Sequence, residues 1–251
     1  MYNRGVEGYG RSTYGDAFAD VYDDWYGTVT DAEATVDLVA ELAAASGSRR
    51  VLELAVGTGR LAVPMARRGL RVTGVDASAA MLAQLAARDP DGAVERVLGD
   101  MVEDLPDGPF GVALIAYNSL FNLESAERQG ACFAAVAARL VPGGRFVVEA
   151  FVPDERAGPA VTVRSMRAGE VVLSISEHDV EAQRAHGQFV QFVDGERVRL
   201  RPWSIRYAPP AELDAMAQAA GFIVADRWTD AHRRPYGDTS SQHLTVYALA
   251  R

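Results

Sequence analysis

The sequence predicts an α/β fold: a Rossmann-like, doubly wound, mostly parallel sheet of seven strands, with an antiparallel β insert after the fifth strand. As far as residue 152, short apolar strand-type runs alternate with helical patterns, and such alternation implies parallel strands joined by helical crossovers. Between residues 154 and 207 the helical patterns stop, and strand-type runs follow one another with turn residues between them, which indicates hairpins.

The first half is predicted element by element. Ala17–Tyr26, aromatic and acidic, is a candidate for one short helix, and Asp31 is the expected N-cap of a helix that ends near Gly47. Strands are then expected at Arg50–Leu54, Arg71–Val75, Val94–Leu98, Val112–Tyr117 and Arg145–Val152. The helices between them are expected at Arg60–Arg68, from the cap Ser78 to Arg88, and at Glu124–Leu140.

The second half contains the insert and the end of the main sheet. The insert strands are expected at Val161–Arg167, Glu170–Asp179, Gly187–Asp194 and Arg197–Tyr207. A helix at Pro210–Ala220 and two strands, Phe222–Asp230 and His243–Leu249, should close the main sheet as an antiparallel pair. We therefore expect residues 1–153 and 208–251 to form the core domain and residues 154–207 to form the insert.

Composition excludes several classes of protein. The 251 residues carry a net charge of −9, which repels phosphate backbones, so we expect no nucleic-acid partner. No apolar run has membrane-spanning length and no signal-peptide pattern is visible, so we expect no membrane partner. The single cysteine, Cys132, cannot form an internal disulfide and sits in a helix-core pattern, which fits a cytoplasmic protein without a catalytic thiol.

The sequence contains no lysine, so every basic side chain apart from the histidines is arginine. This excludes a lysine Schiff base, a phosphate-loop lysine and the Tyr-x-x-x-Lys pair of short-chain dehydrogenases. The four histidines, His178, His186, His232 and His243, do not have the spacing of metal ligands, so we predict no metal.

A glycine-rich turn, Ala55-Val56-Gly57-Thr58-Gly59, follows the first strand, and Asp76 ends the second. Glycines let the backbone come close to a ligand, and the acid can take ribose hydroxyls, so the pattern indicates an adenosine-bearing cofactor. The spacing Gly57-x-Gly59-x-x-Ala62 also satisfies the relaxed dinucleotide fingerprint. A nicotinamide cofactor therefore stays open on this turn alone.

Three neighbouring features favour another cofactor. Glu53, inside the strand before the turn, suits a cationic amino-acid head group better than a pyrophosphate. At Gly99-Asp100-Met101 the acid can accept a hydrogen bond from an adenine amino group while Met101 packs on the ring. The turn Pro142-Gly143-Gly144 precedes the fifth strand.

Together these residues resemble the class I S-adenosylmethionine-dependent methyltransferases, in motifs over residues 14–152 and in layout over the whole chain. The segment Ala19–Tyr26 is similar to the lid of small-molecule N-methyltransferases of secondary metabolism, of the amino-sugar type. Ala55 departs from the family, which most often has Gly there, and is tolerable if its φ is negative. The resemblance implies S-adenosylmethionine as cofactor, a small-molecule acceptor, and an insert that roofs the acceptor pocket.

The positions of these motifs give the expected cofactor site. Its residues are Tyr14, Tyr22, Tyr26, Glu53, Ala55, Gly57, Thr58, Gly59, Arg60, Asp76, Ala77, Met81, Asp100, Met101, Tyr117 and Asn118. Beside the reacting groups we expect Tyr22, Asn122 and His178. Asn122 stands where the amino-sugar enzymes have a His or Tyr, and it cannot act as a base.

The acceptor itself is less defined. Five insert arginines can be interpreted as a grip for a phosphate or carboxylate, or as solvated strand faces: Arg164, Arg167, Arg199, Arg201 and Arg206. The primary hypothesis is methyl transfer to an amine of a metabolite. The alternatives are O-methylation, an NAD-dependent oxidoreductase, and a non-catalytic ligand-binding relative. A homodimer is the candidate assembly.

Overall fold

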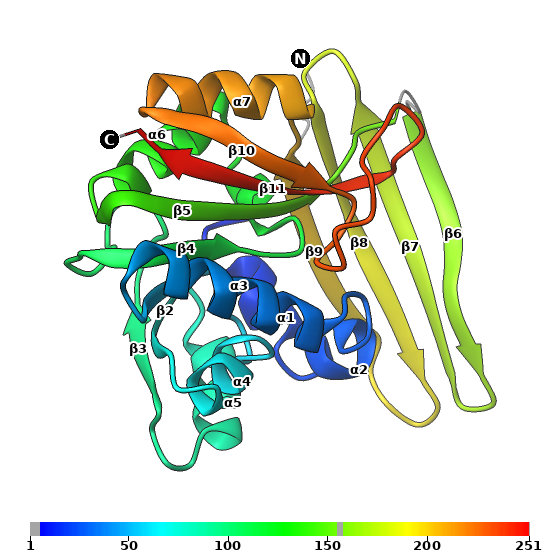
Figure 1. The fold of residues 1–251 in the computed structure, drawn as a ribbon. Coiled ribbons are helices and arrows are strands. Elements are labelled where there is room, and N and C mark those ends of the chain that lie inside the picture. The colour runs from blue at the N-terminus through cyan, green and yellow to red at the C-terminus, as the bar shows by residue number, and fades with distance from the viewer. Residues whose placement is uncertain (1–5, 155–157, 251) are drawn as a thin grey trace.

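The computed structural model describes residues 6–154 and 158–250. It contains a seven-stranded sheet of order β10-β11-β5-β4-β1-β2-β3 and a separate four-stranded antiparallel sheet of order β6-β7-β8-β9 (Figure 1). In the large sheet, neighbouring strands from β5 to β3 are parallel, whereas β11 is antiparallel to both β5 and β10. The predicted fold class is confirmed.

The strands of the large sheet are β1 (Arg50–Leu54), β2 (Arg71–Asp76), β3 (Val94–Leu98), β4 (Phe110–Ile115), β5 (Leu140–Phe151), β10 (Phe222–Trp228) and β11 (Gln242–Leu249). Those of the small sheet are β6 (Gly158–Arg167), β7 (Glu170–Asp179), β8 (Arg184–Val193) and β9 (Arg199–Arg206). The α-helices are α1 (Thr13–Phe18), α2 (Tyr22–Tyr26), α3 (Ala32–Ser46), α4 (Ala62–Arg67), α5 (Ala79–Arg88), α6 (Ala126–Ala137) and α7 (Pro210–Ala219). A 3-10 helix, η1, covers Ser119–Asn122.

Two predicted helix starts are confirmed in atomic detail. The Asp31 side chain accepts the Ala34 N–H at 3.1 Å, and the Ser78 hydroxyl accepts the Met81 N–H at 3.1 Å. The prediction of one helix at Ala17–Tyr26 is wrong, because the chain turns between α1 and α2. The Val21 N–H bonds to the Phe18 carbonyl at 3.0 Å, and both helices thereby direct rings into one aromatic cluster.

Helices cover both faces of the large sheet. Helices α3, α4 and α5 lie on one face, and α6 and α7 lie on the other (Figure 1). Cys132, on α6, is fully buried beside Phe133, and burial raises the pKa of its thiol to about 12, so it is a core residue. None of the helices in the described ranges combines the length and apolar character that a membrane span requires.

The small sheet packs against the N-terminal segment, residues 6–26. Arg201, which is buried on β9, forms an ion pair with Asp20 at 2.5 Å. Phe189, on β8, meets the ring of Phe18 edge to face at 5.8 Å between centroids. The insert therefore fixes the position of α1 and α2.

The five insert arginines considered above all have contacts within the protein. Their partners are the Trp25 and Tyr26 rings for Arg164, Glu170 for Arg167, Asp20 and Glu196 for Arg199, Asp20 and Gln191 for Arg201, and Gln129 and Glu212 for Arg206.

Candidate functional site

A cavity lies at the carboxyl edge of β1, β2 and β3, where α/β sheets place their ligands. Its other walls come from the N-terminal segment, the loop after β4 and the first turn of α6. Ten residues expected from the sequence line it: Tyr14, Tyr22, Ala55, Gly57, Asp76, Ala77, Met81, Asp100, Met101 and Asn122.

The glycine-rich turn follows β1 with three residues in the left-handed region. The φ angles are +52° at Ala55, +56° at Gly57 and +78° at Gly59. The expectation of a negative φ at Ala55 is therefore wrong: the turn needs the left-handed conformation at this position, and the methyl group is accommodated under strain. Gly59 is required for packing as well, because a Cβ there would lie 2.2 Å from Leu85 Cδ1.

Replacing Ala55 by Gly is expected to stabilise the protein by about 0.5–1 kcal/mol, because Gly adopts a positive φ without steric cost. Chemical denaturation of the ligand-free protein would measure the change. The matched control is Ala44→Gly, an exposed position within α3, which should destabilise by about 1 kcal/mol. An Ala55→Gly protein that loses stability as the control does would contradict the inferred strain.

Asp76 connects the turn to α5. One carboxylate oxygen accepts the Gly57 N–H at 2.8 Å, and the other accepts the Ser78 N–H at 2.8 Å. Burial nevertheless raises the pKa of Asp76, against the effect of these two hydrogen bonds. The carboxylate is thus held rigidly at the cavity wall, with lone pairs left for the hydroxyls of a ligand.

Glu53 stands behind the cavity on β1. Its side chain is buried, and its Oε2 atom has no hydrogen-bond partner in the described structure. Burial raises the pKa of Glu53 to about 8; Arg60 opposes this shift and Asp76 adds to it. A buried, unsatisfied carboxyl fits the head group of an amino-acid cofactor, whose ammonium group would give Oε2 its missing partner.

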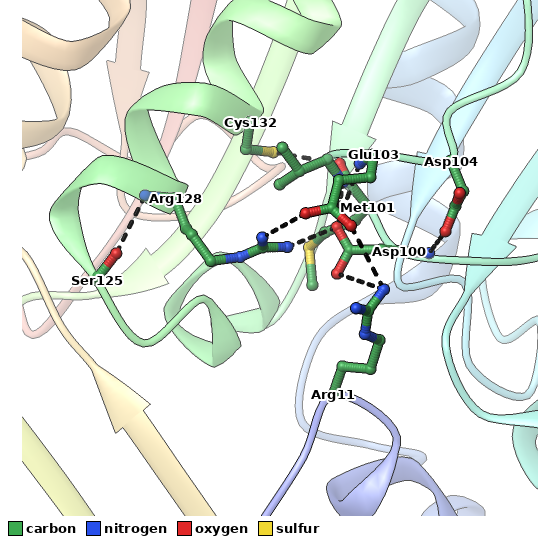
Figure 2. Close-up of polar contacts among 9 residues, drawn as sticks. Arg11, Asp100, Met101, Glu103, Asp104, Ser125, Arg128 and Cys132 are labelled. Atoms are coloured by element: carbon green, nitrogen blue, oxygen red, sulfur yellow. Dashed lines mark hydrogen bonds and ion pairs between the residues drawn. The ribbon is translucent and has the colours of Figure 1, made fainter.

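The loop after β3 is clamped by two arginines (Figure 2). The Oδ1 atom of Asp100 accepts from Arg128 Nη2 at 2.7 Å, and Arg11 Nη1 lies 3.8 Å from the other oxygen. Glu103 pairs with the same two arginines, at 2.8 Å from Arg128 and 3.6 Å from Arg11. The N-terminal segment and α6 therefore meet over the segment that the sequence assigns to adenine.

Four tyrosines form the wall next to the turn. Tyr14 and Tyr22 line the cavity, whereas Tyr26 and Tyr117 stand behind them, with 5.6 Å between their ring centroids. Burial raises the pKa of Tyr117 to about 12 and raises the pKa of Tyr14 and Tyr22 as well. These hydroxyls stay protonated at neutral pH and act as neutral hydrogen-bonding groups.

Several other expected residues have structural partners away from the cavity surface. Asn118 accepts the Phe151 N–H at 2.7 Å, Arg60 donates to Thr30 at 2.7 Å, and Thr58 donates to Asp23 at 2.7 Å. His178 lies within β7, opposite Gly158 and Ala185. His178 and the other described insert residues are not among those that line the cavity. The insert contacts the N-terminal segment through Arg201 and Asp20, and it contacts the lining residue Glu124 through Ser204.

The remaining lining residues were not assigned to the site by sequence reasoning. They are Tyr9, Gly10, Arg11, Gly15, Val75, Gly99, Ser119, Leu123, Glu124 and Arg128. Gly99 lies in a motif that was recognised. Arg11 and Arg128 have no local signal, because their role depends on the folding of two distant segments onto Asp100. Among the described residues no group of three potential ligands is placed to hold a metal ion.

Comparisons with known proteins agree with this geometry. Residues 51–144 match the family model described as a methyltransferase domain. The CcbJ methyltransferase from Streptomyces caelestis is 37% identical, with 97% of this chain and 100% of that chain covered and a TM-score of 0.90. CalS10 from Micromonospora echinaspora, an amino pentose methyltransferase with S-adenosylmethionine bound, is 25% identical, with 92% and 97% covered and a TM-score of 0.71.

A curated relative matches over a shorter stretch. The cypemycin N-terminal methyltransferase of a Streptomyces species is 33% identical over 144 residues, which are 51% of this chain. The match spans 59% of that relative's length.

Proposed function

This chain belongs to the class I S-adenosylmethionine-dependent methyltransferases, and from that premise we propose that it methylates an amine nitrogen of a small metabolite or natural-product intermediate. The observation that supports this proposal most is a cavity lined by Gly57 and Asp76, with the buried, unpartnered carboxyl of Glu53 on the strand that precedes the turn. The amine is supported by the names of two relatives, an amino pentose methyltransferase and the cypemycin N-terminal methyltransferase. Membership in this family removes the NAD-dependent alternative.

Bound S-adenosylmethionine would supply an electrophilic methyl group for an in-line displacement. The chain must therefore bind both reactants, align them for the displacement and exclude water from the site. Positioning alone can lower the activation free energy by roughly 7–11 kcal/mol. We assign Glu53 to the amino-acid head group, Asp76 to the ribose, and Asp100 with Met101 to the adenine. Tyr22 and Asn122 are proposed to face the reacting groups from opposite walls.

We also propose a separate role for the core domain and for the insert, based on how the two pack. We propose that residues 1–153 and 208–251 bind the cofactor and that residues 154–207 form the roof of the acceptor pocket. The hydrogen bond from Ser204 to the lining residue Glu124, together with the ion pair of the buried Arg201 with Asp20, supports this role. The homodimer and the cytoplasmic location stay predictions from the sequence.

Isothermal titration with S-adenosylmethionine and with S-adenosylhomocysteine tests the cofactor assignment, and the absence of binding by both would refute it. A mass-spectrometric product screen on paired amine and phenol acceptors then tests the methylated atom. A gain of one methyl mass on the amines alone is expected. Transfer to the phenols alone would establish the O-methyltransferase alternative, and the absence of transfer to every acceptor would support the non-catalytic one.

A further inference from the structure

One carboxylate in the cavity is not used by the cofactor site just described. Glu124 follows η1, and Leu123 between it and Asn122 is extended, with φ −78° and ψ 103°. Asn122, Leu123 and Glu124 all line the cavity, and Leu123 also packs against the core. Glu124 therefore shares the acceptor side of the cavity with Asn122.

The charged side chains around the cavity differ in whether they have an ion-pair partner. Arg11 and Arg128 are both engaged by Asp100 and Glu103. Among residues 6–154 and 158–250, Glu124 has no cation as an ion-pair partner.

The Glu124 carboxylate is held by neutral groups, whereas its backbone carbonyl accepts a hydrogen bond from the Arg184 guanidinium at 3.0 Å. The Ser204 hydroxyl donates to its carboxylate. The Tyr9 hydroxyl lies beside both residues, and burial raises its pKa to about 12, so it stays neutral. The carboxylate is therefore fixed in position, half-buried in the cavity and without an ion-pair partner among the described residues, so a cationic group bound in the cavity can pair with it.

We propose that Glu124 binds the acceptor nitrogen and selects an amine over a phenol, an inference that rests on the proposed function. The acceptor enters as a protonated amine and loses one proton to solvent before the attack. The resulting neutral amine donates an N–H to the carboxylate while its lone pair faces the methyl group. The new C–N bond forms as the S–C bond breaks, the bonding electron pair stays on sulfur, and the positive charge moves to nitrogen. Glu124 stabilises that charge, and the nitrogen then loses its proton to solvent.

The same carboxylate works against oxygen acceptors. A phenol must lose its proton to become a good nucleophile, and a neighbouring negative charge disfavours the phenolate. The fitting substrate class is therefore an amine.

The test uses sinefungin, in which a carbon bearing a protonated amine replaces the methylated sulfur. Titration calorimetry would compare its affinity with that of S-adenosylhomocysteine for the wild type and Glu124→Gln. The wild type should prefer sinefungin, and Glu124→Gln should lose about fivefold or more of this preference. The matched control, Glu127→Gln, changes an exposed acid on the first turn of α6 and should keep the preference.

The readout is a ratio within each protein, so a general loss of affinity does not alter it. An unchanged preference in Glu124→Gln would overturn the inference. Glu124→Asp keeps the charge on a shorter arm and should keep most of the preference; a complete loss there would assign the effect to packing and would also overturn it. Failure of the wild type to bind either ligand would instead refute the proposed function.

Discussion

Replacing Asp76 by Ala should lower the affinity for S-adenosylmethionine at least about tenfold. Each charge-assisted hydrogen bond to a ribose hydroxyl contributes about 1.5–3 kcal/mol, and the substitution removes the acceptor. It also removes the acceptor of the Gly57 and Ser78 N–H groups, which fix the turn and the start of α5. Titration calorimetry at fixed pH and salt would measure the loss.

Asp76→Asn separates these two effects. The amide keeps the size of the side chain and one oxygen, so it can hold one of the two N–H groups while it loses the charge. We expect it to fold and to bind with an affinity between those of the wild type and Asp76→Ala. Asp91→Ala, in the exposed turn before β3, is the control and should bind normally. Unchanged affinity in Asp76→Ala would mean that the ribose lies elsewhere.

The sequence was sufficient for the parts of this molecule that depend on local patterns. The two helix caps at Asp31 and Ser78, the hairpin of β10 and β11, and the separate small sheet all follow from periodicity and turn residues. The turn after β1 was also located correctly, because its glycines and the acid at the end of β2 have fixed spacing. The conformation of the turn at Ala55 was not predicted correctly, because side-chain identity alone does not determine φ.

Contacts between distant segments could not be predicted in this way. The break between α1 and α2 depends on an aromatic cluster that includes Phe189 from the insert. Arg11 and Arg128 are separated by more than a hundred positions and meet only at Asp100. His178 lies on β7, in the strand range expected from the sequence, but it is not among the residues that line the cavity. Each of these outcomes depends on tertiary packing.

Glu53 should make the stability of the ligand-free protein fall as the pH rises. Its pKa in the folded state is about 8, above the ordinary value of 4.5, so between these pH values the folded state binds more protons than the unfolded state. The contribution of Glu53 to the free energy of unfolding is therefore at its maximum below pH 4.5 and is lost as the pH rises towards 8. The slope should approach about 1.4 kcal/mol per pH unit.

Urea denaturation of the wild type and Glu53→Gln at pH 5, 6 and 7 would measure this contribution as a difference. The comparison is necessary because His243, whose pKa burial lowers to about 4, acts with the opposite sign: it costs stability as the pH falls below 6.5. Gln cannot ionise, so the free energy of unfolding of Glu53→Gln, relative to that of the wild type, should rise with pH. The exposed control Glu181→Gln should show no such relative rise. Saturating S-adenosylmethionine should flatten the wild-type dependence, because its ammonium group favours ionised Glu53. Parallel pH profiles for the wild type and Glu53→Gln without ligand would show that Glu53 is already ionised in the ligand-free fold.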